Sequence, residues 1–425
     1  MISSELLKYA PKPKVLNGNE KWNVFLSYRS VNRTWVLSLY DVLSELKYKV
    51  FLDQYVLKPG DELINNLEDG LEKSQAGILI WSTATRDSDW VRKEYQTLET
   101  MSTVGKNFRF VTIKLDSAEL PVFARNKIFV DFSSYPDGPN GGELLRLLYA
   151  INGEPLGNDS VHFANNLNDI SIKAGAQVQA AIKLGNIQRL VQLYKQGGIP
   201  WDTSASLSCK TAEGLIKVKA NDEAITMLEE IENKFPRSIR PKQLKALAYA
   251  RRGSDRDLDK AQEILGELYE LNNLDPETMG IYARTWMDRY NKSKDIGDLK
   301  QSRDLYADAF EKSPDDYYTG INAAAKSVFI GTEKDIAKAA DYAARVQLLT
   351  GSEVVKGDYW KTATVAEVML IQKKYKEAAE IYEAAVGMAR KEGGSIESTL
   401  KQATRLLEKL QPTEAEKKAV LDAFA

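Results

Sequence analysis

The chain has 425 residues, of which 43% are hydrophobic and 28% charged, and its formal net charge is −2. This length predicts two or three soluble domains, and the balanced charge gives no reason to expect direct binding of nucleic acid or of an anionic membrane. The single cysteine, Cys209, rules out an intrachain disulfide. No apolar run approaches the roughly 20 residues of a bilayer span, so a soluble protein of a reducing, cytoplasmic compartment is expected.

The side chains present limit the kinds of catalytic and metal-binding sites that the protein could form. The only histidine, His162, lies in a polar stretch, and any Ser-His-Asp or Cys-His nucleophile would have to use it. Zinc sites built from cysteine and histidine are excluded by count, so we expect no metal site. If the protein is an enzyme, carboxylates and hydroxyls must carry the reaction.

The first 20 residues contain lysines and prolines but no apolar signal core, which predicts an irregular leader and no export. Short apolar strands then alternate with amphipathic helices as far as residue 151. This β-α-β alternation predicts a five-stranded parallel sheet with helices on both faces. The expected strands are 23–28, 48–52, 76–81, 108–115 and 127–132, and the expected helices are 35–46, 63–71, 88–101 and 143–151.

Polar residues follow three of these strands. Residues 27–30, Asp53 and Ser82 all come where a strand ends. In a parallel sheet the carboxyl ends of the strands share one edge, and ligands bind there. The same region has no Gly-x-Gly-x-x-Gly or Walker loop, so the sequence does not indicate an ordinary dinucleotide-binding or nucleoside-triphosphate-binding fold.

The helix expected from Ser88 starts at this edge. Trp90 and Glu94 stand four residues apart, so the indole and the carboxylate would share one helical face. An isolated glutamate is most often a solvated surface charge, and the neighbouring motifs decide whether this one differs.

Several motifs together resemble the TIR (Toll/interleukin-1 receptor) domain. They are FLSYR at 25–29, VFLD at 50–53 followed by LKPGD at 57–61, LEKSQAGILIWS at 71–82 and DWVRKE at 89–94. In order, they resemble the first conserved sequence box of the TIR domain, its second strand with the BB loop, and its third strand with the residues that lead into it. The last motif resembles the Trp-x-x-x-Glu element of NAD-hydrolysing TIR domains. The resemblance implies an α/β flavodoxin-like TIR domain over 21–151.

The resemblance also implies an activity: NAD+ hydrolysis at the bond between nicotinamide and ribose, giving ADP-ribose or a cyclic isomer. NAD+ would be the substrate, and no further cofactor is implied. Glu94 would be catalytic. The implied binding residues are Arg29 and Ser30 near phosphate or ribose oxygens, Asp53 fixing the loop that borders the pocket, Trp90 beneath the site, and Leu57 and Ser82.

A single carboxylate suffices physically for this reaction. Nicotinamide in NAD+ is already cationic and leaves without a strong acid, so the reaction needs a negative group that stabilises the oxocarbenium-like ribose. Structural roles remain open for two residues: Trp90 as a core aromatic, and Arg29 as a partner in a structural ion pair.

Two further functions remain open for the TIR region. It could be a non-catalytic scaffold or adaptor that assembles signalling partners, or it could bind a nucleotide without turnover. By resemblance, the BB loop, residues 53–61, would complete the site of a neighbouring copy, so that activity would depend on self-association.

After a predicted linker at 152–170, rich in Asn, Gly and Asp, the pattern becomes helical to the end of the chain. Pro236, Pro276 and Pro314 recur between amphipathic helices, a pattern typical of paired-helix repeats. Residues 171–425 are therefore predicted as an all-α TPR-like solenoid. The expected helices are 171–184, 187–196, 204–219, 221–234, 240–251, 257–272, 277–290, 298–312, 317–330, 333–349, 358–372, 375–391 and 395–409.

Within the repeats, YYTGINAA at 317–324, WKTATVAE at 360–367 and STLKQ at 398–402 resemble a TPR-like regulatory region. That region also occurs in the apoptosis-signal-regulating MAP kinase kinase kinases, where it is called TRAF-binding. It implies control of the TIR domain by the repeats, with a protein or peptide partner on their concave face. The combination of a TIR domain with helical repeats resembles an immune or cell-death effector, with antiviral defence in bacteria as its natural setting.

Overall fold

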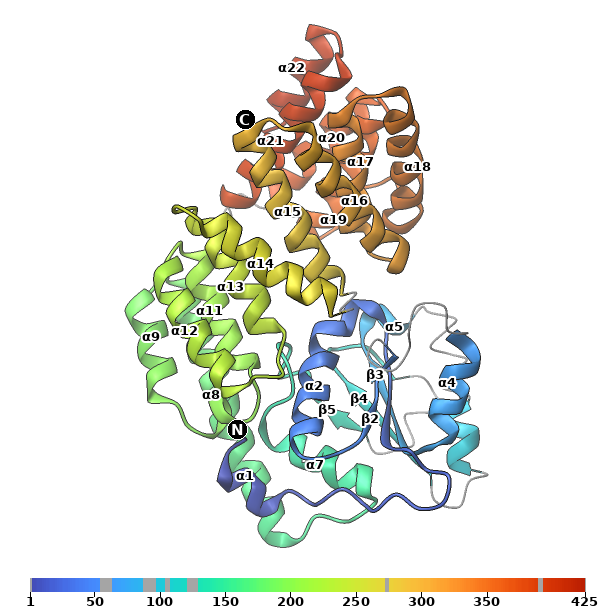
Figure 1. Ribbon diagram of the computed structural model, residues 1–425, viewed down its shortest axis with the longest axis vertical. Helices are drawn as coiled ribbons and strands as arrows, with labels where there is room; N and C mark the ends of the chain where they lie inside the picture. Colours follow the sequence, from blue (N-terminus) through green and yellow to red (C-terminus); the bar gives the residue numbers. More distant parts are fainter. Residues whose placement is uncertain are drawn as a thin grey trace. The chain divides into compact units, whose positions relative to one another are not determined.

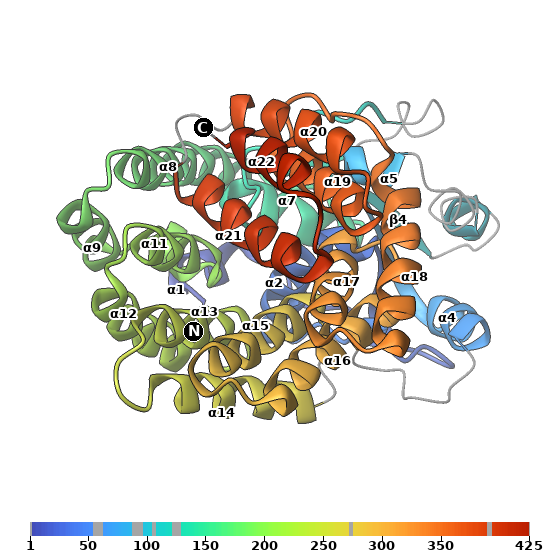
Figure 2. The same ribbon diagram turned by 90° about the horizontal axis from the view of Figure 1, so that it is seen from above.

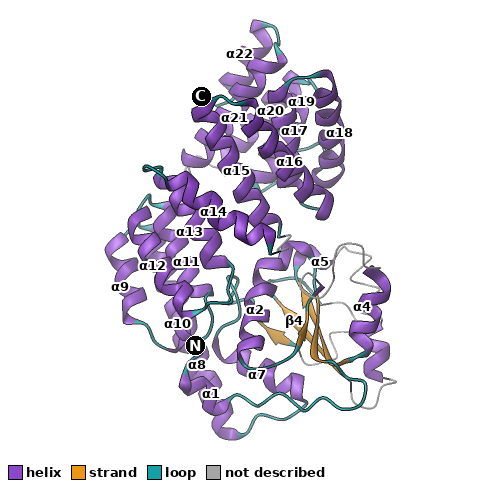
Figure 3. Ribbon diagram, viewed as in Figure 1, coloured by secondary structure: helices purple, strands orange, loops and turns teal. Residues whose placement is uncertain are grey.

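The computed structural model describes residues 2–53, 63–86, 97–103, 108–120, 129–271, 275–388 and 393–424. The chain divides into two compact units, Met1–Lys260 and Ala261–Ala425. Among the described residues, strands are confined to 22–131, and helices joined by loops and turns follow from residue 141 onward (Figure 1, Figure 3).

The first unit contains the five-stranded sheet that the sequence predicts. All neighbouring strands are parallel, in the order β2-β1-β3-β4-β5. Strand β1 pairs with β2 on one side, Val24 opposite Val50, and with β3 on the other, Val24 opposite Ala76. The strands are β1 (Trp22–Ser27), β2 (Val50–Phe51), β3 (Ser74–Trp81), β4 (Arg109–Lys114) and β5 (Val130–Asp131).

Helices cover both faces of this sheet, which confirms the predicted layers. Along β3, Ile78 and Ile80 join the core under α2 (Arg33–Glu45) and α7 (Gly141–Asn152). Leu79 and Trp81 face the opposite way, into the core that includes Leu71 of α4 (Leu63–Glu72). The strand is buried from both sides, which explains its continuous apolar run.

The remaining helices follow the predicted positions closely. Between α7 and residue 260 the structure has α8 (Asn158–Lys183), α9 (Ile187–Gln196), α10 (Ile199–Asp202), α11 (Ser206–Lys217), α12 (Asn221–Lys234) and α13 (Arg240–Arg252). Helix α14 (Asp257–Glu270) begins before residue 260. It is followed by α15 (Pro276–Ser293), α16 (Ile296–Lys312), α17 (Tyr317–Ile330), α18 (Glu333–Thr350), α19 (Tyr359–Ile371), α20 (Tyr375–Met388), α21 (Gly393–Leu410) and α22 (Glu414–Asp422). The predicted helical-repeat region is confirmed, and α10 and α22 were not predicted.

The recurring prolines lie at helix boundaries: Pro236 follows α12, Pro314 follows α16, and Pro276 begins α15. At α15, Pro276 is the first helical residue, where its missing N–H is not needed, and the Asp275 side chain accepts a hydrogen bond from the backbone of Thr278. Sequential helices pack against each other, α15 against α16, α16 against α17 and α17 against α18.

Two segments predicted as irregular contain helices. Residues 4–9 of the predicted leader form α1 (Ser4–Tyr9), whose Leu6 is fully buried, and the Tyr9 ring stacks on Phe163 at 4.2 Å. Residues 158–170 of the predicted linker form the first half of α8. The linker prediction is wrong there, and the first compact unit joins the α/β part with helices that the sequence assigned to a separate domain.

The asparagines of this segment are part of a polar contact between helices. The Asn168 side-chain oxygen accepts hydrogen bonds from the Gly142 backbone N–H and from the Tyr135 hydroxyl, both at 2.7 Å. Its amide donates to Glu143 at 2.9 Å, and Arg146 donates to Asn165 at 2.7 Å. The asparagine-rich composition of this segment is typical of a linker, but here the asparagine side chains hold α8 against α7 through hydrogen bonds.

Candidate functional site at the carboxyl edge of the sheet

The strand order fixes where a ligand crevice can form. From β1 the chain crosses to β2 on one side of the sheet, and β3 lies on the other side. In a sheet of order 2-1-3-4-5 the connections from β1 and β3 diverge, and the crevice opens beyond their carboxyl ends. Residues 28–32 follow β1 and Ser82 follows β3, so both lie at this switch point, and Asp53 follows the neighbouring strand β2.

One hydrogen bond joins the ends of β1 and β2. The half-buried Tyr28 donates from its hydroxyl to Asp53 Oδ1 at 2.9 Å. Burial, reinforced by the Asp53 charge, raises the pKa of Tyr28 far above its ordinary value, so the phenol stays protonated and remains a donor. Asp53 is the last described residue before position 63. The bond therefore anchors the point from which the predicted BB loop departs.

A second hydrogen bond joins the ends of β1 and β3. Asn32, the last residue of the 3-10 turn η1 (Ser30–Asn32), donates from its side-chain amide to Ser82 Oγ at 3.0 Å. Ser82 is buried, and its backbone N–H donates to Thr85 Oγ1 at 2.6 Å. Thr85 lies in α5 (Thr83–Arg86), so the turn after β1 and the short helix after β3 are fixed to each other.

Asp116, after β4, fixes the start of α5 from the other side. Its carboxylate accepts from the Thr83 backbone N–H at 2.8 and 3.0 Å and from the Ala118 N–H at 2.8 Å. Partial burial opposes ionisation of this carboxyl, but the backbone donors outweigh it and hold its pKa below the ordinary value. The edge is thus built from backbone-anchoring polar groups.

The structure describes part of the predicted site. Arg29, the backbone of Ser30, Asp53 and Ser82 lie along this edge, at the ends of β1, β2 and β3. The remaining predicted residues, Leu57, Trp90 and Glu94, lie outside the described residues, as does most of the BB loop.

Two residues that shape the edge were missed by sequence reasoning. Asn32 and Asp116 act through hydrogen bonds to Ser82 and to the backbone of α5, across separations of 50 and 33 residues. No motif in the sequence links these positions, and only the strand order brings them together.

Within the described ranges, no group of three or more His, Cys, Asp or Glu side chains is placed to hold a metal ion. No helix among the described residues is both long and apolar enough to cross a bilayer.

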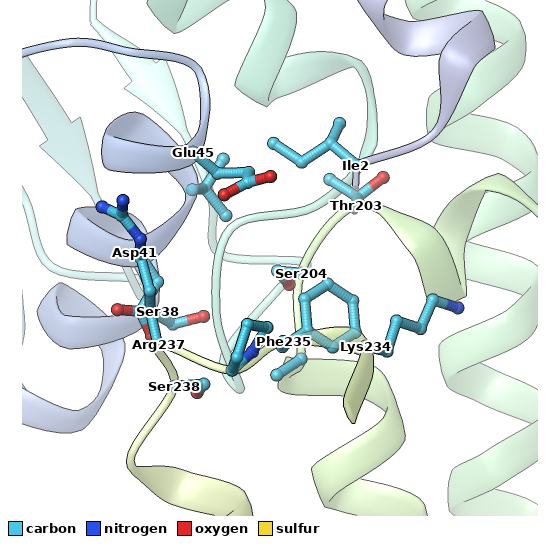
Figure 4. Close-up of a pocket in the computed structure, with 13 residues that line it drawn as sticks. Ile2, Ser38, Asp41, Glu45, Thr203, Ser204, Lys234, Phe235, Arg237 and Ser238 are labelled. Carbon is cyan, nitrogen blue, oxygen red and sulfur yellow. The ribbon is translucent and has the colours of Figure 1, made fainter. Parts of the chain in front are cut away.

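Helix α2, which begins at this edge, also contacts the first helical repeats (Figure 4). Ser38, Asp41 and Glu45 of α2 face the segments 203–205 and 234–238, with a cavity of about 40 Å³ between them. That volume admits water but no cofactor. Arg237 on the repeat side is complementary in charge to Asp41, whereas Lys234 forms an ion pair with Asp202 of the same side. Burial raises the pKa of Asp41 to about 7, against a hydrogen bond from Ser238 and the charge of Arg237, which both lower it.

A doubly wound parallel sheet joined to paired helical repeats defines the class of the chain. Residues 24–147 match the family profile described as "TIR domain", and residues 220–327 match the profile described as "Tetratricopeptide Repeats-Sensor". The chain therefore carries a TIR domain followed by TPR-sensor repeats.

Several curated proteins are similar to the TIR part. A "Probable 2' cyclic ADP-D-ribose synthase TcpB" of Brucella melitensis is 30% identical over 92 residues, 21% of this chain and 37% of its own length. "NAD(+) hydrolase TcpC" of Escherichia coli is 31% identical over 83 residues, 19% of this chain and 27% of its own. "2' cyclic ADP-D-ribose synthase AbTIR" of Acinetobacter baumannii is 30% identical over 79 residues, 18% of this chain and 29% of its own length. The matched stretch thus spans about a third of the length of these relatives.

Two solved structures are similar in parts. The TIR domain of a Toll-related receptor of Hydra magnipapillata is 21% identical, covering 27% of this chain and 86% of that chain, with a TM-score of 0.24. A thermophilic TPR protein of Thermus thermophilus is 17% identical, covering 48% of this chain and 98% of that chain, with a TM-score of 0.36.

Proposed function

We propose that this protein is an NAD+ hydrolase that cleaves the bond between nicotinamide and ribose. The observation that carries the proposal is the similarity of its TIR domain, at about 30% identity, to proteins named NAD(+) hydrolase and 2' cyclic ADP-D-ribose synthase. The order of the strands supports it, because a crevice at the β1/β3 switch point is where a nucleotide binds in such sheets.

Glu94 is the catalytic carboxylate of this proposal. As the nicotinamide departs, positive charge develops on the ribose, and a fixed carboxylate nearby stabilises that charge more than it stabilises the substrate. No strong general acid is needed, because the cationic nicotinamide ring takes up the bonding electron pair and departs as a neutral base. Water attack on the ribose gives ADP-ribose, and attack by a hydroxyl of the same molecule gives a cyclic isomer.

The remaining residues of the edge bind the substrate in this proposal. Arg29 and Ser30 contact phosphate or ribose oxygens, and Ser82, Leu57 and Trp90 line the pocket. Asp53, held by the Tyr28 hydroxyl at 2.9 Å, anchors the BB loop. Residues 53–61 complete the site of a neighbouring copy, so the protein is active when its TIR domains self-associate.

The helical repeats control this activity. The contact between α2 and the segments 203–205 and 234–238 supports the proposal, since α2 starts at the crevice and ends against the repeats. A rearrangement of the repeats would reach the crevice through one rigid helix. Loss of NAD+, or the signal made from it, suits an immune or cell-death effector such as one acting in antiviral defence.

The test is nicotinamide release from NAD+ by the purified full chain, alone and with a crowding agent that promotes assembly. The wild-type protein should release nicotinamide, and Glu94→Gln, which keeps the shape but removes the charge, should reduce the rate about 10²-fold or more. Glu72→Gln, an exposed carboxylate on α4, is the matched control and should retain activity. If wild type releases no nicotinamide in any assembled state, the TIR domain is a scaffold and the proposal fails.

A further inference from the structure

The second unit contains a cavity of about 240 Å³ among α15, α16, α17, α19 and α21. The three repeat motifs of the sequence, 317–324, 360–367 and 398–402, come together here although the first ends 74 positions before the last begins. Helices α17, α19 and α21 pack against one another around it (Figure 2). Small-molecule sites have volumes of about 300 to 1,000 Å³, and this cavity lies just below that range.

Two charged side chains are buried in the wall of the cavity. Lys326 is 4% exposed and Glu367 is 9% exposed. The Lys326 ammonium donates to Asn322 Oδ1 at 2.7 Å, and Gln402 donates to Glu367 Oε1 at 2.8 Å. Among the described residues, neither Lys326 nor Glu367 has an ion-pair partner within 4.0 Å. Buried charges without a direct partner cost stability, and groups of this kind cluster at functional sites.

Further charges surround this pair and give the cavity a positive balance. Arg284, Lys401 and Arg405 add three cations, and Asp288 adds one carboxylate. Arg284 lies 4.0 Å from Asp288, and Arg405 donates to Asn291 Oδ1 at 3.1 Å. Burial lowers the pKa of Lys326, and the charges of Arg405 and Arg284 lower it further, so the cations of the cavity repel one another. An anion entering the cavity would relieve this repulsion.

Two large aromatic side chains of the cavity are open to solvent. Trp360 is 53% exposed and Tyr318 is 48% exposed. Each ring is held edge-to-face by a buried tyrosine, Trp360 by Tyr359 at 5.0 Å and Tyr318 by Tyr306 at 6.2 Å. A fixed, exposed indole offers a flat face for a planar ring, and such stacking tolerates many ring structures.

We propose that this cavity binds a nucleoside monophosphate or a closely similar small anion that carries a planar ring. Arg284, Lys401 and Arg405 would take the phosphate, and Trp360 would stack on the base. The polar side chains of Asn322, Glu367 and Gln402 would bind the sugar hydroxyls, which both accept and donate hydrogen bonds. The repeats of this chain are then a small-molecule sensor, whichever reaction the TIR domain performs.

The test is isothermal titration calorimetry of the full chain with AMP, together with CMP, GMP and UMP. AMP has no nicotinamide–ribose bond, so its binding is measured independently of any NAD+ cleavage. At least one monophosphate should bind saturably at one site per chain with a dissociation constant below about 1 mM. Adenosine, ribose 5-phosphate and inorganic phosphate should each bind at least about tenfold more weakly than the best monophosphate, because each lacks the ring or the anion.

Two exposed residues supply variants that keep the fold. Trp360→Ala should weaken binding roughly 5- to 150-fold through lost stacking, and Lys401→Ala should weaken it and reduce its dependence on salt. Lys409→Ala, on the exposed surface of the same helix α21 and outside the cavity, should bind as wild type does. Circular dichroism should show unchanged helicity for all three. The proposal is overturned if no monophosphate binds, if phosphate alone binds as tightly, or if both cavity variants bind like wild type.

Discussion

The packing of α8 on α7 predicts that Gly142→Ala destabilises the first unit. Gly142 lies in the first turn of α7, and a Cβ there would be 2.8 Å from the Ala164 Cα and closer still to its carbonyl group. Both obstacles are backbone atoms of α8, so they cannot move away as a flexible side chain would. Relieving the overlap requires the two helices to separate by about 1 Å, which weakens their dispersion contacts.

The expected change in the free energy of unfolding is the balance of one stabilising contribution and two destabilising ones. Alanine is the better helix former by at most about 1 kcal/mol, whereas overpacking of a tight contact costs about 1 to 3 kcal/mol. Separation would also stretch the hydrogen bond from the Gly142 N–H to Asn168, 2.7 Å long, which contributes about 1 kcal/mol. The expected net loss is about 1 to 3 kcal/mol, or a decrease in the melting temperature of the first unit by about 2 to 4 °C for each kcal/mol.

The assay is thermal and urea unfolding of the full chain, with Gly175→Ala as the control. Gly175 lies in α8, and no atom beyond its own stretch of helix lies within 4 Å of the position that an alanine Cβ would take, so alanine there should leave stability unchanged or raise it. If Gly142→Ala proves as stable as Gly175→Ala, the close contact between α7 and α8 does not exist in solution, and the linker interpretation of 158–170 returns.

Three further predictions concern the edge of the sheet and its surroundings. Tyr28→Phe removes the hydrogen bond to Asp53 and should lower the free energy of unfolding by about 1 to 2 kcal/mol in urea titrations; an unchanged stability would show that the bond is not formed. Burial raises the pKa of Asp41 from 3.8 to about 7, so its contribution to stability is complete below about pH 4 and is lost as the pH rises through 7. Urea unfolding should show a loss of about 1 kcal/mol per pH unit across this window in wild type and a smaller one in Asp41→Asn, and equal slopes would contradict the assignment. Nicotinamide release per molecule should rise with protein concentration if neighbouring BB loops complete the site, and a constant specific rate would argue against that.

The strands and the repeats were predictable because their patterns are local. The continuous apolar run 76–81 marks a strand buried on both faces, and the helical spacing beyond residue 171 marks amphipathic helices whose ends the structure reproduces closely. The parallel sheet followed from the alternation of these elements, and its carboxyl edge followed from the sheet. Arg29, Asp53 and Ser82 could therefore be placed on that edge from the sequence alone.

What could not be predicted depends on contacts between distant residues. Asn168 resembles a linker residue until the Gly142 backbone N–H is seen beside it, and Leu6 resembles part of a leader until its burial is known. The same holds for Asn32, which contacts Ser82 only because β1 and β3 are neighbours. In each case a polar or isolated residue has its partner far along the chain, and local pattern carries no information about that partner.

The most direct test of the account is the comparison of wild type and Glu94→Gln in nicotinamide release from NAD+ under conditions that promote assembly. The account predicts release by wild type, a rate reduced about 10²-fold or more in Glu94→Gln, and near-normal release by Glu72→Gln. Equal rates for wild type and Glu94→Gln would remove Glu94 from the reaction and contradict the account.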